Sequence, residues 1–325
     1  MPIAPRGPVP GIGVGTWAWG NQFLWGYDPA RDDQLEATFR RAVERGLTVF
    51  DTADSYGTGR FDGRSEALLG RFCASLPPAE RQRLIVATKL APFPWRLGRN
   101  GFERALAASR QRLQGKLDRV QLHWSTARYA PWQEGPLVDG LAERVLRGEV
   151  RELGVSNLGP RRLRALHRRL AERGVPLRSL QIQLSLLAPE ALLPGGAVDV
   201  CRDLGIEVIA YSPLALGLLA RSPGSLEAPA GPRGLLFRRL WTRVQPLLQA
   251  LDHIARAHGT TSAAVALNWC RSHRALPIVG LRTADQAEAA AAALAWQLSD
   301  DLCEKLDRLA FACRARMPAN PFQSA

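Results

Sequence analysis

The chain has 325 residues, of which 46% are apolar and 22% charged, and this is the composition of an ordinary globular protein. It excludes a disordered, collagen-like or coiled-coil chain. The formal charge is +13, from 43 basic and 30 acidic residues. A basic chain attracts nucleic acid, membranes or anionic small ligands. Because the arginines are spread over the whole length, we expect no nucleic-acid partner.

The sequence also limits where the protein works. No stretch reaches the roughly 18–20 uncharged apolar residues of a membrane-spanning helix, and the first residues lack the apolar core of a signal peptide. The five cysteines, without a CxxC pair, are typical of thiols kept reduced. We expect no membrane partner, a monomer or weak homo-oligomer, and a bacterial cytoplasmic location, or the plastid stroma if a transit peptide has been removed.

Short apolar or β-branched runs alternate with longer helical patterns along the chain, which predicts a parallel sheet of βα units. Strands are expected at 11–15, 48–51, 84–89, 119–123, 150–155, 179–183, 206–211 and 277–279. Helices are expected at 33–44, 65–72, 101–113, 137–147, 160–173, 197–203, 247–258, 262–270, 283–292 and 299–311. Eight such units predict an α/β fold, a single-domain (β/α)₈ TIM barrel over residues 1–325 with its active site at the C-terminal face.

Two further segments stand out. Residues 213–236 are rich in Gly, Pro and Ser, and an irregular segment of that length is usually functional, so a long loop on the cofactor side, acting as a lid, is expected there. Residues 299–325 are expected to form a C-terminal helix and tail. No metal is expected, because Cys270 and His273 supply only two of the four ligands of a closed zinc site.

Ionisable residues end three successive predicted strands. Asp51, Lys89 and His123 are these residues, and Tyr56 lies on the loop after Asp51. Strand ends meet at one barrel mouth, so Asp51 and Lys89 are expected to form a buried ion pair. The nearby ammonium would favour the ionised form of Tyr56 and make it a better proton donor. Without further information, a structural ion pair with an incidental Tyr56 and His123 fits equally well.

Six motifs then follow one another along the chain. They are FDTADSYG at 50–57, ATK at 87–89, LHW at 122–124, GVSN at 154–157, QIQ at 181–183 and YSPL at 211–214. In their order and spacing the chain resembles the aldo-keto reductases over nearly its whole length. The resemblance implies a catalytic tetrad of Asp51, Tyr56, Lys89 and His123, with Tyr56 as the general acid of carbonyl reduction, and a bound nicotinamide cofactor.

The resemblance also implies which residues bind that cofactor. From carboxamide to adenosine phosphate, they are Ser156, Asn157, Gln183, Tyr211, Ser212, Pro213, Leu214, Gly217, Arg221, Gly280, Arg282 and Gln286. A helix start beside an arginine is by itself a plausible anion site. Arg221 and Arg282 favour NADPH over NADH, since a guanidinium suits the 2′-phosphate. Ala289 and Ala290 replace the Glu-Asn pair that contacts adenine in many members.

A narrower resemblance concerns the substrate. Segments 15–22, 24–27, 54–60, 94–97, 122–127 and 231–238 and the tail ending Phe322-Gln323 are similar to the pyridoxal-reducing members of that family in plant plastids. This implies reduction of pyridoxal, a small-molecule aldehyde, to pyridoxine. Flat apolar walls for such a ring are expected from Trp19, Trp25, Trp95 and Trp124. A broad-specificity aldehyde or sugar reductase remains an alternative, as does a slow NADPH-binding redox sensor or partner like the potassium-channel β subunits.

Overall fold

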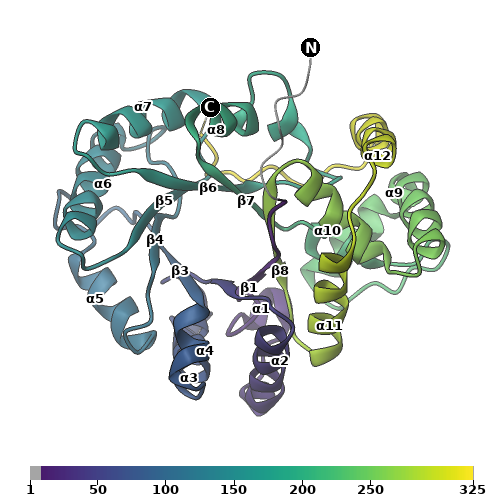
Figure 1. Cartoon of the computed structure of the whole chain (residues 1–325), viewed down its shortest axis with the longest axis horizontal. Coiled ribbons are helices and arrows are strands. Elements are labelled where there is room, and N and C mark those ends of the chain that lie inside the picture. The colour runs from purple at the N-terminus through teal and green to yellow at the C-terminus, as the bar shows by residue number, and fades with distance from the viewer. Residues whose placement is uncertain (1–8, 325) are drawn as a thin grey trace.

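The structure is a computed structural model and describes residues 9–324. Its parallel strands close into one barrel, because β1 pairs with both β2 and β8 (Figure 1). The strands are β1 (Gly13–Gly15), β2 (Val49–Asp51), β3 (Ile85–Leu90), β4 (Arg119–Leu122), β5 (Glu152–Ser156), β6 (Leu177–Gln183), β7 (Glu207–Tyr211) and β8 (Ala275–Gly280). The predicted (β/α)₈ barrel is confirmed.

Helices surround this barrel. The α-helices are α1 (Gln22–Trp25), α2 (Asp32–Glu44), α3 (Arg64–Ala74), α4 (Pro78–Arg83), α5 (Glu103–Arg112), α6 (Pro131–Leu146), α7 (Pro160–Ala171), α8 (Ala197–Leu204), α9 (Pro232–Ala257), α10 (Ser262–Ser272), α11 (Ala284–Ala292) and α12 (Asp300–Ala312). Short 3₁₀ helices are η1 (Pro29–Arg31), η2 (Gly59–Phe61), η3 (Glu190–Leu192), η4 (Ala215–Ala220) and η5 (Ala293–Ala295). Among the α-helices, only α1 and α4 of the described chain are absent from the sequence-based prediction.

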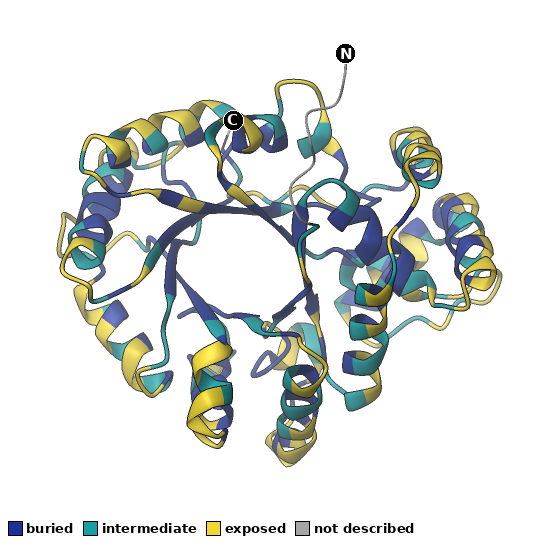
Figure 2. Ribbon diagram, in the orientation of Figure 1, coloured by how far each residue is buried: buried dark blue, intermediate teal, exposed yellow. Residues whose placement is uncertain are grey.

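The core lies between the strands and the inner faces of the helices (Figure 2). Helix α7 shows how the sequence produces this arrangement: Leu163, Leu166 and Leu170 recur every three or four residues and are buried, while arginines occupy its outer face. Close packing also limits residue size on β1. A Cβ added to Gly13 would lie 3.0 Å from a side-chain carbon of Ile278 and 3.2 Å from the Val49 backbone oxygen, so a side chain there would be crowded by both neighbouring strands.

The segment after β7 is more ordered than predicted. The expected loop 213–236 contains η4, and α9 begins at Pro232 rather than at residue 247. Pro246, inside α9, suggests an interruption, since an internal proline costs about 3 kcal/mol. Buried apolar residues from Phe237 to Leu251 continue at helical spacing on both sides of it, and their packing offsets that cost. Within residues 9–324 neither α9 nor any other helix has an apolar stretch long enough to span a membrane.

Candidate active site

A fully partnered ion pair forms the floor of the barrel mouth. Lys89 Nζ donates hydrogen bonds to the carboxylate of Asp51 and, at 2.7 Å, to the backbone oxygen of Thr52, and the two charged side chains are 1% and 3% exposed. Gln121 and Gln181 donate to Asp51 Oδ1 at 3.0 and 2.8 Å. A buried pair is tolerated when its remaining hydrogen bonds are made. The sequence analysis did not identify these two glutamines as site residues, because it considered only ionisable residues at the strand ends. Both point into the barrel, from β4 and β6.

Tyr56 and His123 lie directly above this floor. Lys89 Nζ is 4.8 Å from the centre of the Tyr56 ring, and the Tyr56 and His123 rings are 5.8 Å apart in an edge-on arrangement. Ser55 Oγ lies 3.4 Å from Nδ1 of His123. The structure therefore brings together all four residues of the predicted tetrad; their catalytic roles stay predictions.

Burial controls the protonation of these groups. It raises the pKa of Tyr56, and the Lys89 ammonium opposes this without reversing it. The ammonium does favour the ionised tyrosine, as predicted, but desolvation outweighs it, so the net shift of the Tyr56 pKa is upward. Burial would lower the pKa of Lys89, but Asp51 and Tyr56 together raise it. Burial and Lys89 both hold the pKa of His123 well below its usual range, which keeps the imidazole neutral at pH 7.

Asn157 is the centre of a second polar network at the mouth. Its amide nitrogen donates to the His123 backbone oxygen at 3.0 Å and to Ser156 Oγ at 3.1 Å. Its amide oxygen accepts from Tyr211 Oη at 2.9 Å and from Asn320 Nδ2 at 3.0 Å. Ser156, Asn157 and Tyr211 of the predicted nicotinamide site thus lie together. Burial raises the pKa of Tyr211 to about 12, so this phenol stays a donor.

The C-terminal tail, in yellow beyond α12 in Figure 1, also reaches this network. Asn320 contacts Tyr211 as well as Asn157, and the backbone nitrogen of Ser324 donates to the backbone oxygen of Asn157 at 3.1 Å. The Phe322 ring stacks on Trp124 with centres 4.6 Å apart. The sequence analysis gave these tail residues no role at the site, because nothing local in the sequence indicates that a segment some 160 residues away covers Asn157.

The remaining residues predicted to bind the cofactor on this side lie at the ends of β6 and β7 and in the turn that follows. They are Gln183, Ser212, Pro213, Leu214 and Gly217. The backbone of this turn is unusual, because Ala215, Leu216 and Gly217 have φ angles of 48°, 58° and 96°. For Ala215 and Leu216, which are not glycine, this left-handed conformation costs energy, and such residues cluster at ligand clamps. The conformation is therefore consistent with a segment shaped around a ligand.

A basic rim borders the mouth beyond this turn. Gly280 ends β8, and the Arg282 backbone nitrogen donates to Gln286 Oε1 at 2.8 Å, while Thr283 caps the start of α11. A cavity of about 190 Å³ lies beside this start, lined by Arg282, Gln286 and Arg31 among others. Gly280, Arg282 and Gln286 thus lie in one segment around the start of α11; their binding of the cofactor stays a prediction.

Arg233 is the rim residue that sequence reasoning missed. Its guanidinium lies 4.1 Å above the centre of the Trp25 ring, and that of Arg282 lies 5.6 Å from the same centre. Burial together with Arg282 and Arg221 lowers the pKa of Arg233 to about 10, and burial with its basic neighbours also lowers that of Arg282. Within residues 9–324 neither arginine is paired with a carboxylate, whereas Arg221 lies 3.7 Å from exposed Glu227.

Comparisons with known proteins now decide the family. The family model described as "Aldo/keto reductase family" matches residues 11–310. The chain belongs to the aldo/keto reductase family. It is 46% identical over 318 residues to the chloroplastic pyridoxal reductase of Arabidopsis thaliana. The matched region covers 96% of this chain and 86% of that protein. It is 32% identical over 299 residues to a 6-dehydroglucose reductase of Novosphingobium aromaticivorans, covering 86% and 87%.

Solved structures agree with this assignment. An aldo-keto reductase from Klebsiella pneumoniae in complex with NADPH superposes with a TM-score of 0.70 at 27% identity, covering 97% of this chain and 94% of that one. An aldo/keto reductase from the same organism with NADP and acetate gives a TM-score of 0.71 at 27% identity, covering 98% and 96%. This aldo/keto reductase is therefore an oxidoreductase with the fold of its relatives.

The four tryptophans predicted to line the substrate pocket have different surroundings. Trp19 was predicted wrongly: it is fully buried, packs on Phe72 and donates to the Leu281 backbone oxygen at 2.8 Å, because its side chain points into the core beneath the mouth. Trp25 lies on the arginine rim rather than beside Tyr56. The Trp124 and His123 ring centres are 5.0 Å apart, and Trp95 is 73% exposed and stacks on Phe93.

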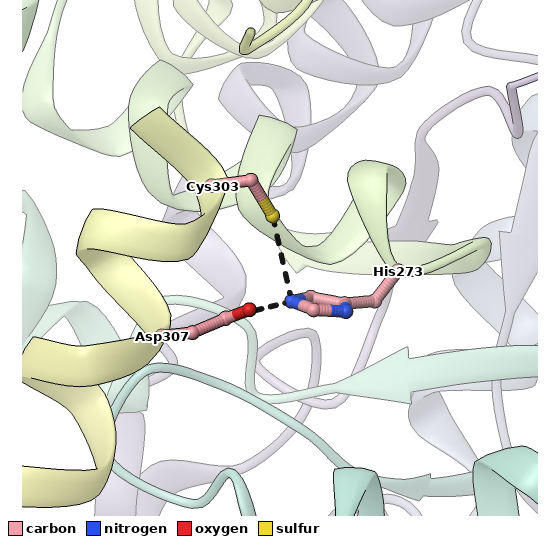
Figure 3. Close-up of side chains that lie close together, drawn as sticks. All are labelled: His273, Cys303 and Asp307. Atoms are coloured by element: carbon pink, nitrogen blue, oxygen red, sulfur yellow. Dashed lines mark hydrogen bonds and ion pairs between the residues drawn. The ribbon is translucent and has the colours of Figure 1, made fainter. Parts of the chain in front are cut away.

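A separate cluster joins α10 to α12 (Figure 3). His273 Nε2 lies 2.8 Å from Asp307 Oδ1 and 3.6 Å from Cys303 Sγ, and Trp269 Nε1 donates to the same aspartate oxygen at 2.7 Å. His273, Cys303 and Asp307 each carry an atom that could bind a metal, and these three atoms lie within 4.8 Å of one another. Cys270, weighed with His273 from the sequence, is instead buried near the Leu184 backbone oxygen. The groups satisfy one another, so we interpret the cluster as a clamp between two helices; the absence of a metal stays a prediction.

Proposed function

We propose that this aldo/keto reductase reduces aldehydes with NADPH, and that its substrate is pyridoxal, which it converts to pyridoxine. The observation that carries the reductase function is the floor of the mouth, where Tyr56 and His123 stand above the buried Lys89–Asp51 pair. The 46% identity to a plant pyridoxal reductase over nearly the whole chain supports the choice of substrate.

The residues present fit a nicotinamide dinucleotide. Buried polar groups are normally hydrogen-bonded, so an unpartnered one marks a place where a ligand can bind. Two such donors, Trp25 Nε1 and Arg233 Nε, lie on the basic rim of the described chain. Ser156, Asn157 and Gln183 would hold the carboxamide, Tyr211 the ring, and Arg282 the adenosine phosphate. When bound, NADPH supplies the hydride that the carbonyl carbon accepts.

The chain's own groups then handle the proton. Tyr56 stays protonated near neutral pH, because burial raises its pKa, and it donates its phenolic proton to the carbonyl oxygen as charge develops there. The Lys89 ammonium stabilises the phenolate that remains, and Asp51 keeps Lys89 charged and in place. Neutral His123 positions the same oxygen through a hydrogen bond.

Aromatic side chains around Tyr56 would receive the flat ring of the substrate. Trp17 lies 6.2 Å from the Tyr56 ring centre and is partly exposed. On the other side Trp124 stacks on Phe322, and Phe93 stacks on Trp95 with centres 4.8 Å apart. Such walls bury an aromatic aldehyde without giving it a charged partner. The proposed pocket thus keeps Trp95 and Trp124 and replaces Trp19 with Trp17.

A substrate panel tests the proposal. NADPH consumption is measured with pyridoxal, with benzaldehyde and other aromatic aldehydes, and with aliphatic aldehydes and open-chain sugars, each at several concentrations and repeated with NADH. We expect the largest kcat/KM with pyridoxal and NADPH, and pyridoxine as the product by chromatography. Comparable kcat/KM values across the panel would refute the narrow substrate and leave a general aldehyde reductase. Tight NADPH binding without turnover of any aldehyde would refute the enzyme and favour a sensor or partner role.

A further inference from the structure

Three side chains that can bind a metal converge between α10 and α12. Cys303 and Asp307 are about one turn apart on α12, so they lie on the same face of that helix, and His273 at the end of α10 faces them (Figure 3). Their ligating atoms lie within 4.8 Å of one another. His273 stands just before the start of β8, whereas the mouth lies at the other end of that strand, at Gly280. The cluster is therefore separate from the proposed reaction.

Cys303 and Asp307 face the same nitrogen of the His273 ring. Nε2 lies 2.8 Å from Asp307 Oδ1 and 3.6 Å from Cys303 Sγ. An imidazole nitrogen has at most one hydrogen, so it can form a full hydrogen bond with only one of these two atoms at a time. A cation between the three atoms would be bound by all of them at once. This convergence favours a metal site over a relay, in which the histidine would use both of its nitrogens.

The spacing of the three atoms is close to that of a tetrahedral zinc site. With Zn–S of about 2.3 Å and Zn–N and Zn–O of about 2.0–2.2 Å, neighbouring ligand atoms are roughly 3.3–3.6 Å apart. The sulfur–nitrogen distance already matches, and the Asp307 oxygen would move away from the nitrogen by only about 0.5 Å. The His273 and Asp307 side chains are 20% and 29% exposed, so an ion can enter and water can take the fourth position.

The chemistry of the donors favours zinc over harder cations. A Cys303 thiolate and the Asp307 carboxylate carry two negative charges, which balance a divalent ion beside a neutral imidazole. Thiolate and imidazole are ligands for zinc, whereas magnesium and calcium prefer oxygen. Trp269 Nε1 donates to Asp307 Oδ1 at 2.7 Å, and the Trp269 and His273 rings meet edge-on with centres 4.9 Å apart. Outer contacts of this kind orient the ligands of a metal.

We infer that His273, Cys303 and Asp307 form a zinc site that joins α12 to α10. Binding breaks the S–H bond of Cys303, forms a Zn–S bond in its place and releases the proton to solvent. In the metal-free protein the same groups form the hydrogen-bonded clamp described above. The expectation of no metal weighed Cys270 with His273, and a ligand set divided between helices some 30 positions apart has no local signal in the sequence. The zinc site does not depend on the proposed function.

Zinc titration of the full chain tests the inference. The protein is freed of metal with a chelator, desalted and kept reduced with a phosphine, so that no added thiol competes for the metal. Calorimetry should then show one zinc per chain with a Kd on the order of 1 μM or lower, and no uptake of magnesium. Zinc at 100 times its Kd should raise the Tm by about 4 °C. Cobalt in place of zinc should give the near-ultraviolet absorption band of a cobalt–thiolate bond.

Substitutions separate a metal site from a hydrogen-bonded clamp. Cys303→Ser keeps a group that can hydrogen-bond to His273 but removes the soft ligand, so the zinc Kd should rise at least about 10-fold and the cobalt–thiolate band should disappear. Asp307→Asn should raise the zinc Kd by a similar factor. Cys313→Ser, which changes a partly exposed cysteine at the end of the same helix, is the matched control and should alter neither quantity.

Uptake of zinc only at millimolar concentrations would overturn the inference. A Kd that Cys303→Ser and Asp307→Asn leave unchanged would also overturn it, because the ion would then bind elsewhere, and so would equal weakening in Cys313→Ser. If Asp307→Asn does not fold, judged by circular dichroism, Cys303→Ser and its cobalt spectrum decide by the same criteria.

Discussion

The floor of the barrel mouth and its rim hold positive charge in opposite ways. On the floor, Lys89 is buried, paired with Asp51 and hydrogen-bonded to Thr52. On the rim, Arg233 and Arg282 share the Trp25 ring and lack a carboxylate within residues 9–324. Pairing raises the pKa of the lysine, whereas burial, joined by repulsion from neighbouring arginines, lowers the pKa of Arg233 and Arg282.

This difference separates what the chain completes alone from what a ligand completes. A satisfied floor keeps its geometry whether or not a ligand is present, as proton transfer at a fixed oxygen requires. The arginines of the rim repel one another, and this electrostatic cost falls only when an anion binds between them. Substitutions on the floor should therefore alter turnover or folding, and changes at the rim should alter affinity for the cofactor and its dependence on salt.

Removing the Tyr56 hydroxyl is the most direct test of the proton donor above the floor. Tyr56→Phe keeps the ring and its edge contact with His123 but removes the donated proton. We expect kcat for aldehyde reduction to fall by about 10²–10⁴, the usual contribution of a general acid, while the NADPH Kd changes less than twofold. Steady-state kinetics and calorimetry measure the two quantities.

The same experiment can contradict the assignment. If Tyr56→Phe retains more than a tenth of the kcat, the proton comes from another group. Trp132→Phe, an exposed aromatic substitution on α6, serves as control and should not alter either quantity.

Lys89→Met tests the floor as a structural unit. The variant leaves Asp51 buried with two glutamine donors but no cation. Breaking one partner of a buried pair costs about 3–5 kcal/mol, so we expect a fall of that size in the free energy of unfolding, measured by urea denaturation at pH 7. The exposed Lys305→Met is the control and should cost less than about 0.5 kcal/mol. A small loss in both variants would show that the pair contributes little to folding.

NADPH itself sharpens the comparison at the rim. At a concentration of 100 times its Kd it should stabilise the fold by about 2.7 kcal/mol, by mass action. The Kd should rise with sodium chloride, because salt screens the attraction between partly exposed arginines and phosphates. Thermal unfolding and calorimetry at 50 and 500 mM salt measure this. An affinity independent of salt would mean that Arg221, Arg233 and Arg282 do not contact the phosphates.

The floor was predictable from the sequence because its signals are local. Asp51 ends β2, Lys89 is the next-to-last residue of β3 and His123 directly follows β4, and parallel strands of a barrel bring such ends to one mouth. The eight βα units follow from the alternation of short apolar runs and helical periodicity in the same way. Each of these predictions needs only the residues of one element and the rule that joins neighbouring elements.

The contact between Trp25 and Arg233 on the rim was not predictable, because it depends on side-chain direction and distant contacts. Trp19 and Trp25 both follow β1, yet one is buried against Phe72 and the other meets Arg233 of α9. Arg233 lies in a segment whose glycines and prolines indicate a loop, and only the structure shows that α9 has begun there. The contact of Asn320 with Asn157 likewise spans 163 positions and has no local signal.

The clamp between α10 and α12 offers the smallest effect and a third kind of charge, half-buried and paired. Burial opposes ionisation of Asp307, but the hydrogen bonds from His273 and Trp269 outweigh it and lower the pKa of the carboxyl. A folded-state pKa below the unfolded value means that the charged aspartate stabilises the fold above about pH 4 and that this contribution disappears as the pH falls through the folded-state pKa. Asp307→Asn should therefore destabilise the protein at pH 7 by about 1 kcal/mol, a modest value because the groups are partly exposed.

Urea midpoints of the two proteins at pH 7, 5 and 3 measure that difference, which we expect to be present at pH 7 and 5 and to shrink at pH 3. Glu304→Gln is the control on the same helix, because Glu304 pairs with Arg308 at 3.7 Å with both side chains at least 70% exposed. Its effect should stay below about 0.5 kcal/mol at each pH, as for exposed pairs in general. A difference for Asp307→Asn that stays constant down to pH 3 would show that the carboxylate charge is not what stabilises the clamp, and that packing of α12 on α10 stabilises it instead.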